Sequence, residues 1–190
     1  AGIQALPELG PFHLVAFSWG CAVSSQIVKL HQDQLLSLLL VGPASIGDIP
    51  RRGLMEPLIK RHSGMSQEQV FSANKENLAR LMIHQRLRID DMAVYIQTEN
   101  TNRARFNSPQ FVRSTLVLDG VRGMKAPLKV IYGQNDAPGL PDIESKEALF
   151  RAVKPDVHFE IVPDAGHWLQ YERSEIFNSM CEQWLNNNKG

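Results

Sequence analysis

Four short apolar runs alternate along the chain with longer stretches in which apolar residues recur every three or four positions. Such short runs are typical of strands buried on both faces of a sheet. They lie at residues 12–17, 35–41, 128–133 and 157–162. The longer stretches predict the end of a helix at 1–9 and amphipathic helices from Gly20 to His31, at 143–153 and at 168–185. This alternation predicts an α/β fold, a mostly parallel sheet with helices on both faces.

The stretch from Ala44 to Lys125 interrupts the alternation. It is richer in Arg, Met, Gln and Asn, it contains no convincing strand, and apolar residues such as Leu78 and Met82 fall at helical spacing. We therefore expect a helical insertion between the second and third strands. The chain then divides into a first core part, an insertion and a second core part, at residues 1–43, 44–125 and 126–190.

Composition narrows the possible functions. Lys and Arg total 20, as do Asp and Glu, so the net charge is zero and we expect no nucleic-acid or membrane-surface partner. The longest apolar stretch, 35–42, is far shorter than the roughly 18 residues of a membrane helix. Two cysteines cannot build a disulfide framework, which favours a cytoplasmic location. Composition leaves open whether the chain forms a homo-oligomer.

Ser18 lies where the first strand passes into a helix, and small residues stand two positions before it and two after, at Ala16 and Gly20. A sharp strand-to-helix turn of this kind exposes the serine hydroxyl, and larger side chains at the flanking positions would collide with nearby backbone. The backbone N–H of Trp19 would then point toward a developing oxyanion. The alternative is an ordinary N-cap serine that opens the helix.

Two more polar residues follow later strands. Asp136 lies in the loop after the third run, and His167 lies in the loop after the fourth. Loops at the carboxyl ends of parallel strands meet at one edge of a sheet, so both should approach Ser18. The chain order Ser, Asp, His also fits a catalytic triad on an α/β sheet. We prefer Asp136 to Asp164 as the acid, because a residue so close to the histidine has difficulty reaching the distal side of its ring.

These motifs resemble the second half of an α/β-hydrolase, over residues 11–43 and 126–185. The insertion at 44–125 then takes the place of the helical cap of that fold. Within the superfamily, Gly166 to Glu172 and Arg88 to Asp91 resemble the meta-cleavage-product hydrolases and related small capped esterases. The former are serine enzymes that cut carbon–carbon bonds in dienoic keto acids.

The chain departs from this family pattern at several positions. Ala16 and Cys21 replace common glycines around Ser18, and both are small enough to fit. The carbon–carbon hydrolases carry an arginine for an acidic substrate where this chain has Gln97, which favours a neutral ester or related acyl substrate. The resemblance also implies further strands and a helix before Ala1, on the order of 80 to 100 residues, including a loop that gives a second oxyanion donor.

The resemblance implies a serine hydrolase that uses Ser18, Asp136 and His167 on a small ester or a carbon–carbon diketone substrate. We expect the Trp19 N–H in the oxyanion hole, and Trp19, Gln97 and Trp168 around the substrate pocket. No metal or cofactor is expected. The alternatives are a cofactor-free perhydrolase or acyltransferase with the same triad, or a ligand-binding protein without catalysis.

Overall fold

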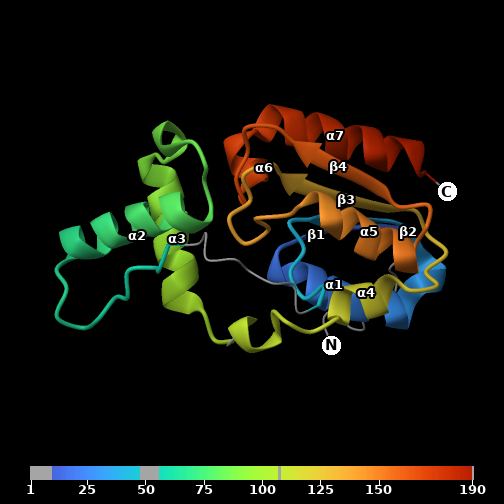
Figure 1. The fold of residues 1–190 in the computed structure, drawn as a ribbon, viewed down its shortest axis with the longest axis horizontal. Helices are drawn as coiled ribbons and strands as arrows, with labels where there is room; N and C mark the ends of the chain where they lie inside the picture. The colour runs from blue at the N-terminus through green and yellow to red at the C-terminus, as the bar shows by residue number, and fades with distance from the viewer. Residues whose placement is uncertain (1–9, 48–55, 107, 190) are drawn as a thin grey trace.

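A computed structural model describes residues 10–47, 56–106 and 108–189. The helix predicted at residues 1–9 lies outside the described residues. The chain forms a parallel sheet in the order β1-β2-β3-β4, with helices on both sides (Figure 1). The strands are β1 Phe12–Phe17, β2 Leu35–Val41, β3 Leu128–Gly133 and β4 His158–Val162. The four predicted strands and the predicted α/β class are confirmed.

Strand β2 presents apolar side chains on both faces because helices cover both. In β2, Leu38 and Leu40 pack in the core cluster on one face, while Leu39 and Val41 pack in the cluster on the other. All four side chains are at most 1% exposed. Each buried leucine stabilises the fold by about 1.5–3 kcal/mol relative to an exposed one. An alternating pattern would not suit such strands.

The described helices that pack on the sheet form two groups, one on each face (Figure 1). The first group is α1 Trp19–His31, α4 Leu116–Val121 and α5 Glu144–Val153. The second group is α6 Leu169–Glu172 and α7 Ser174–Asn187. The helices α1 and α4 approach so closely that a Cβ added to Gly120 would collide with the Cβ of Ser25. This contact fixes the chain just before it enters β3.

A single closing helix at 168–185 was the wrong expectation, because the chain breaks at Arg173 between α6 and α7. Arg173 has φ −128° and ψ 47°, outside the helical region. Its side chain is engaged elsewhere: Nε donates to the Asp164 carbonyl at 3.1 Å and the guanidinium lies 3.4 Å from the Asp164 carboxylate. Helical periodicity continues across the break, so the sequence pattern hides it.

Between β2 and β3, the described residues contain helices and turns but no strand, as predicted. The main elements are α2 Gln67–Leu81 and α3 Asp91–Arg103, with short 3₁₀ turns at Arg86–Arg88 and Ser108–Phe111. A further 3₁₀ turn, Gln32–Gln34, leads into β2. We call residues 56–103 the helical segment; Figure 1 shows it beside the α/β core.

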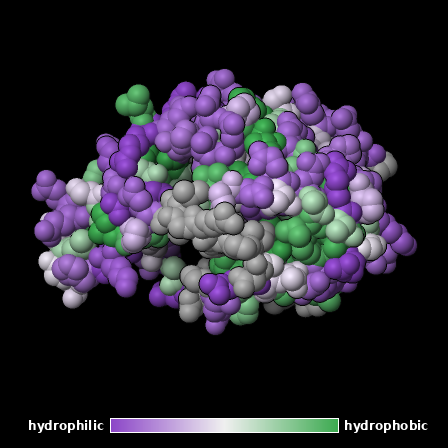
Figure 2. Space-filling model, viewed as in Figure 1, coloured by the Kyte–Doolittle hydropathy of each residue, from purple (hydrophilic) through white to green (hydrophobic). Residues whose placement is uncertain are grey.

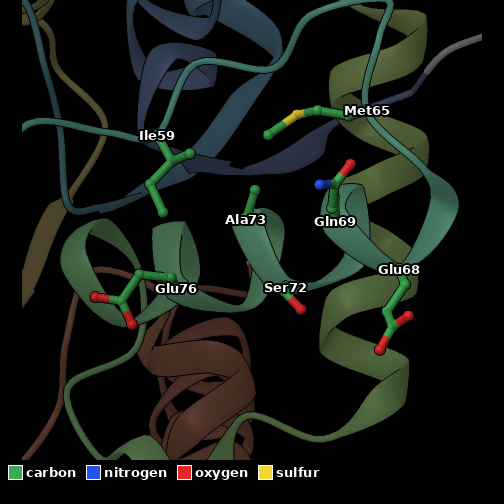
Figure 3. Close-up of a pocket in the computed structure, with 7 residues that line it drawn as sticks. All are labelled: Ile59, Met65, Glu68, Gln69, Ser72, Ala73 and Glu76. Atoms are coloured by element: carbon green, nitrogen blue, oxygen red, sulfur yellow. The ribbon is translucent and has the colours of Figure 1, made fainter.

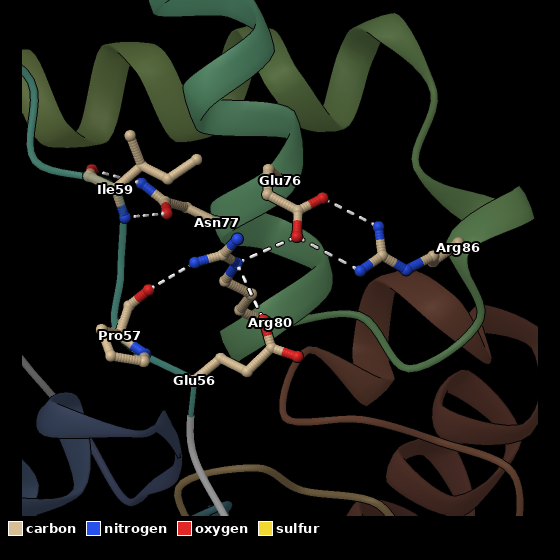
Figure 4. A network of polar contacts seen from close by, with 7 residues as sticks. All are labelled: Glu56, Pro57, Ile59, Glu76, Asn77, Arg80 and Arg86. Carbon is tan, nitrogen blue, oxygen red and sulfur yellow. Dashed lines mark hydrogen bonds and ion pairs between the residues drawn. The ribbon is translucent and has the colours of Figure 1, made fainter.

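Hydrogen bonds and ion pairs between its own residues stabilise the helical segment. A capping box between Ser66 and Gln69 starts α2. Glu76 accepts hydrogen bonds from Arg86 at 2.8 and 3.2 Å and from Arg80 at 2.9 Å (Figure 4). The bonds from Arg86 and then Arg80 lower the pKa of Glu76 to about 2. Asn77 pairs with both backbone groups of Ile59 and so ties the preceding chain to α2.

Hydrophilic residues cover most of the face seen in Figure 2, over the helical segment as well as the core. Large apolar side chains are nevertheless exposed, among them Leu87, Leu30 and Tyr95. Single exposed apolar residues of this kind are normal for a folded protein.

Candidate active site

The turn around Ser18 is strained and held from both sides. Ser18 has φ 51° and ψ −119°, in the left-handed region that a residue with a Cβ rarely adopts. Its N–H donates to the Val41 carbonyl at 2.8 Å, and its own carbonyl accepts from the N–H of Cys21 at 3.1 Å. The side chain makes no capping bond to α1. The hydroxyl of Ser18 is therefore free of the helix and turned to another partner.

The predicted need for small flanking residues finds support on one side only. Ala16 is buried, and its carbonyl accepts from the Cys21 Sγ at 3.4 Å. At Gly20, an added Cβ would meet no described atom within 4 Å. The described residues therefore give no steric reason for a glycine there.

Asp136 is fully buried in the loop after β3. Its Oδ1 accepts the N–H of Gly139 at 2.8 Å, which closes a tight turn. Lys146 of α5, itself buried, donates its ammonium to the carbonyls of Gly139 and Asp142. We call the loop between β3 and α5, residues 134–143, the acid loop. It is thus fixed by its own backbone and by α5. The second carboxylate oxygen, Oδ2, remains for a partner outside the loop.

That partner is His167, which is 4% exposed in the loop after β4. The Nδ1 atom lies 2.8 Å from Asp136 Oδ2, and Nε2 lies 2.8 Å from the Oγ of Ser18. An ionised carboxylate only accepts, so Nδ1 carries the proton and Nε2 accepts from the Ser18 hydroxyl. The structure therefore brings together the three residues that the sequence singled out, at the carboxyl edge of the sheet.

Gly42, which directly follows β2, leaves space for the side chains of Asp136 and His167 because it has no Cβ. It has φ 51°, and an added Cβ would lie 2.9 Å from both Asp136 Oδ2 and His167 Nδ1. Its N–H donates to the Ile131 carbonyl at 2.8 Å, which holds it against β3. In the sequence, Gly42 marks only the end of a strand, and its role in the cluster was missed. The available signal was its place at the same sheet edge as the candidate acid.

The other acid considered, Asp164, pairs with an arginine, while Asp136 is the carboxylate at His167 Nδ1. The Asp164 carboxylate is 70% exposed and lies 3.4 Å from the Arg173 guanidinium.

Cys21 is completely buried, and burial raises the pKa of its thiol far above the ordinary value. A neutral thiol in such surroundings is a small apolar core residue.

Trp19 lies in an aromatic cluster. Its ring centroid is 5.2 Å from that of Phe106 and 5.4 Å from that of Phe111, and the two phenylalanine rings are 5.5 Å apart. The chain after α3 thus returns to the residue next to Ser18. The N–H of Trp19 belongs to the first turn of α1, where helix N–H groups have no intrahelical acceptor.

The two other residues predicted around the substrate pocket are Trp168 and Gln97. Gln97 belongs to the helical segment, and Trp168, which follows His167, packs against that segment. Trp168 stacks on Tyr171 at 4.9 Å, and both pack against an apolar cluster that includes Leu78 and Val94. Its backbone N–H donates to the Met82 carbonyl at 2.7 Å. Gln97 lies half-buried in α3. Two cavities adjoin α2, one of about 300 Å³ and one of about 500 Å³, and Gln97 lines neither.

The smaller of these cavities, of about 300 Å³, lies between the end of α2 and the acid loop. Its lining is largely apolar, with His84 and Asn135 as its polar side chains. The lining residues are Ala79, Leu81, Met82, Ile83, His84, Asn135, Ala137 and Leu140.

A cavity of about 500 Å³ lies on α2, between it and the chain at residues 59–65 (Figure 3). It is lined by Ile59, Met65, Glu68, Gln69, Ser72, Ala73 and Glu76. Neither this cavity nor the smaller one is lined by Ser18, Asp136 or His167, but the smaller one is lined by Asn135 and Ala137, the neighbours of Asp136. Among the described residues, no helix is both long and apolar enough to cross a membrane.

Comparison with known proteins places this geometry in a family. The chain matches the model described as the alpha/beta hydrolase family over residues 1–179. A curated relative is the 2-hydroxy-6-oxononadienedioate/2-hydroxy-6-oxononatrienedioate hydrolase of Comamonas testosteroni, 23% identical over 191 residues. That match covers 92% of this chain but only 63% of the relative, so the chain spans less than two thirds of the relative's length.

Solved structures agree on the fold. A variant of the meta-cleavage product hydrolase CumD from Pseudomonas fluorescens IP01, complexed with acetates, is 15% identical with a TM-score of 0.73, over 99% of this chain and 69% of that one. A thermophilic esterase from Thermogutta terrifontis is 22% identical with a TM-score of 0.68, over 98% and 69%. A bromoperoxidase from Bacillus anthracis is 14% identical with a TM-score of 0.71, over 97% and 70%. The chain belongs to the alpha/beta hydrolase family.

Proposed function

We propose that the protein is a serine hydrolase in which Ser18 is the nucleophile, His167 the general base and Asp136 the residue that orients the base. The observation that carries the proposal is the unbroken chain of contacts from Ser18 Oγ to His167 Nε2 and from Nδ1 to Asp136, each 2.8 Å long. Both distances lie in the range that general-base catalysis requires.

The reaction begins when the Ser18 hydroxyl attacks the substrate carbonyl and His167 Nε2 takes its proton. Asp136 keeps the imidazole in the tautomer that accepts this proton and stabilises the imidazolium. The imidazolium then gives the proton to the leaving group, and an acyl group remains on the Ser18 oxygen. Water, deprotonated by His167, releases that acyl group and restores the hydroxyl.

The backbone N–H of Trp19 supplies one donor to the oxyanion that forms in each half of the reaction. Its place at the start of α1 supports this role, because the N-terminal end of a helix favours negative charge. Loss of one oxyanion donor typically lowers turnover by about a hundredfold to a thousandfold.

A small neutral ester is the proposed substrate class. We assign the insertion at residues 44–125 as a cap made by its helical segment, while α4 in the same insertion packs on the sheet. Residues 79–84 of this cap form, with the acid loop, the cavity of about 300 Å³ that we assign to the substrate. Its lining contains no Lys or Arg that would bind an acidic group, which favours a neutral acyl group. The family resemblance points the same way, because the position expected to hold an arginine is Gln97, although Gln97 does not line this cavity. Cys21 and Cys181 are free, which supports a cytoplasmic location.

Carbon–carbon hydrolysis of a diketone is the second candidate, because the curated relative is named for that class of reaction. The two are separated by giving the full-length protein a short p-nitrophenyl ester and a dienoic keto acid. We expect hydrolysis of the ester with a higher kcat/KM. The reverse preference would favour the second candidate, and added peroxide or alcohol would reveal perhydrolase or acyltransferase products.

Covalent labelling tests the nucleophile itself. A fluorophosphonate should modify the native protein once, at Ser18, and Ser18→Ala should abolish both the label and ester hydrolysis. Ser179→Ala is the matched control, since Ser179 is exposed on α7 and should leave both unchanged. Ligand binding without any label or turnover would instead identify a non-catalytic member of the fold.

A further inference from the structure

A carboxylate outside the proposed triad is buried beside the histidine loop. Glu172, the last residue of α6, is 4% exposed. Its Oε2 accepts the backbone N–H groups of Gly166 at 2.7 Å and His84 at 3.1 Å, and its Oε1 accepts that of Gln85 at 2.5 Å. A buried carboxylate is stable only where donors replace its water. Here three backbone donors do so.

The donors belong to two segments far apart in sequence. Gly166 immediately precedes His167, whereas His84 and Gln85 follow α2 in the helical segment. On the other side of His167, the N–H of Trp168 donates to the Met82 carbonyl at 2.7 Å. The backbone is therefore fastened to residues 82–85 immediately before and immediately after the histidine.

The contact at Gly166 is too close for a side chain. A Cβ added there would lie 2.7 Å from the N atom of His84, 2.8 Å from the Met82 carbonyl oxygen and 3.1 Å from Glu172 Oε2. Two backbone segments this close leave no room for one to shift toward the other, and close-packed interiors transmit strain.

The same short segment also forms a wall of the cavity near the acid. Met82 and His84 line it from one side, and Asn135 and Ala137, the neighbours of Asp136, line it from the other. A displacement of residues 82–85 would therefore change both the backing of the histidine loop and the shape of this cavity.

We propose that Glu172 is a positioning residue: through its three bonds it sets where the His167 imidazole lies relative to Ser18, and it fastens the wall at 82–85 to that same loop. The inference rests on the proposed function for its kinetic consequences. Misplacement of a reacting group by about 1 Å can lower a rate about a hundredfold. A small movement of the loop is thus enough to affect turnover.

Glu172→Gln is the informative change because it keeps the shape and removes one acceptor. Both carboxylate oxygens accept backbone N–H groups, but an amide has one oxygen. Its NH₂ group would face a donor, so at least one fastening is lost. Glu175→Gln is the matched control, because Glu175 is exposed in the first turn of α7.

The experiment compares both variants with the native full-length protein, at a temperature where all are folded. For Glu172→Gln we expect kcat to fall about tenfold to a hundredfold. We also expect a displaced pH profile and a shifted or broadened low-field proton resonance from Nδ1 of His167. Glu175→Gln should match the native protein in all three. If Glu172→Gln does not fold, Glu172→Asp, which keeps the charge but shortens its reach, carries the same comparison.

A residue needed only for folding would lower the melting temperature and leave the folded enzyme with native kcat, pH profile and resonance. That result would overturn the inference. Should the native protein lack hydrolase activity while Glu172→Gln still shifts the resonance, the proposed function fails and the positioning role stands. Native activity together with an unaltered Glu172→Gln variant would overturn the positioning role and leave the proposed function standing.

Discussion

The edge of the sheet and the helical segment hold their polar side chains in different ways. At the edge, Asp136 and His167 are 0% and 4% exposed, and backbone donors or close packing fix each of them. In the helical segment, the largest charged network centres on Glu76, and the Arg86 side chain in it is 64% exposed. Buried polar groups lose much when one partner is removed, whereas solvated ion pairs lose little. Substitutions at the edge should therefore alter chemistry, and those in the network should alter stability slightly.

The largest effect should come from the nucleophile and base. Ser18→Ala and His167→Ala should each lower kcat on a p-nitrophenyl ester by about 10⁵- to 10⁶-fold, and the double variant should be no slower than either. The reason is that the two act as one unit, so the second loss removes nothing more. Steady-state kinetics of the three variants measure this; additive losses would contradict a shared step.

Next in size is the acid. Asp136→Asn should lower kcat by about ten-thousandfold with KM little changed, because an amide favours the wrong imidazole tautomer. Asp164→Asn should leave kcat within about twofold, since its exposed carboxylate faces Arg173 and surface changes of this kind have small effects. Steady-state kinetics of the two variants make the comparison. A larger loss from Asp164→Asn would reverse the assignment of the acid.

A smaller loss should follow from filling the space beside the Asp136–His167 pair. Gly42→Ala adds a methyl group 2.9 Å from both side chains, and we expect about 1–3 kcal/mol of destabilisation from overpacking together with lower kcat. Gly123→Ala is the control: it has a similar positive φ of 71° but no atom within 4 Å. Denaturant unfolding and kcat check both. Equal kcat losses from the two variants would assign the effect to backbone strain.

The smallest effect should come from the helical segment. Hydrogen bonds from Arg86 and Arg80 depress the folded pKa of Glu76 from 4.5 to about 2. Its contribution to stability is therefore present above pH 4.5 and is lost as the pH falls toward 2. Glu76→Gln should lower the melting temperature slightly at pH 7, less at pH 3 and less in high salt, with kcat unchanged. Glu182→Gln, another exposed change, serves as control; an effect that grows on acidification would contradict the ion pair.

Much of the core could be predicted from the sequence because its signals are local. The run at 35–41 is apolar throughout except for Ser37, and a strand covered on both faces is the simplest structure for it. Ser18, Asp136 and His167 each follow a strand, and parallel topology alone brings such loops to one edge. Their meeting was therefore foreseeable before any distance was known.

Other features depend on contacts that no local pattern carries. In the sequence, Glu172 continues the amphipathic pattern of a helix. In the structure its carboxylate is buried, because the backbone N–H groups of His84 and Gln85 donate to it. The break at Arg173 coincides with a bond from its side chain to the Asp164 carbonyl, which lies nine residues earlier in the chain. In the sequence, Gly42 marks only the end of a strand. A glycine fits there because Asp136 and His167, about 90 and 125 residues further along the chain, lie against it in the fold.

In the proposed mechanism Ser18 becomes covalently acylated with the help of His167. The most direct measurement is peptide mapping by mass spectrometry of the full-length protein, quenched during turnover of a slow ester. We expect one acyl group on the peptide that contains Ser18, and none in the His167→Ala variant within the same time. An acyl group on another residue, or turnover with no acylated protein at all, would contradict it.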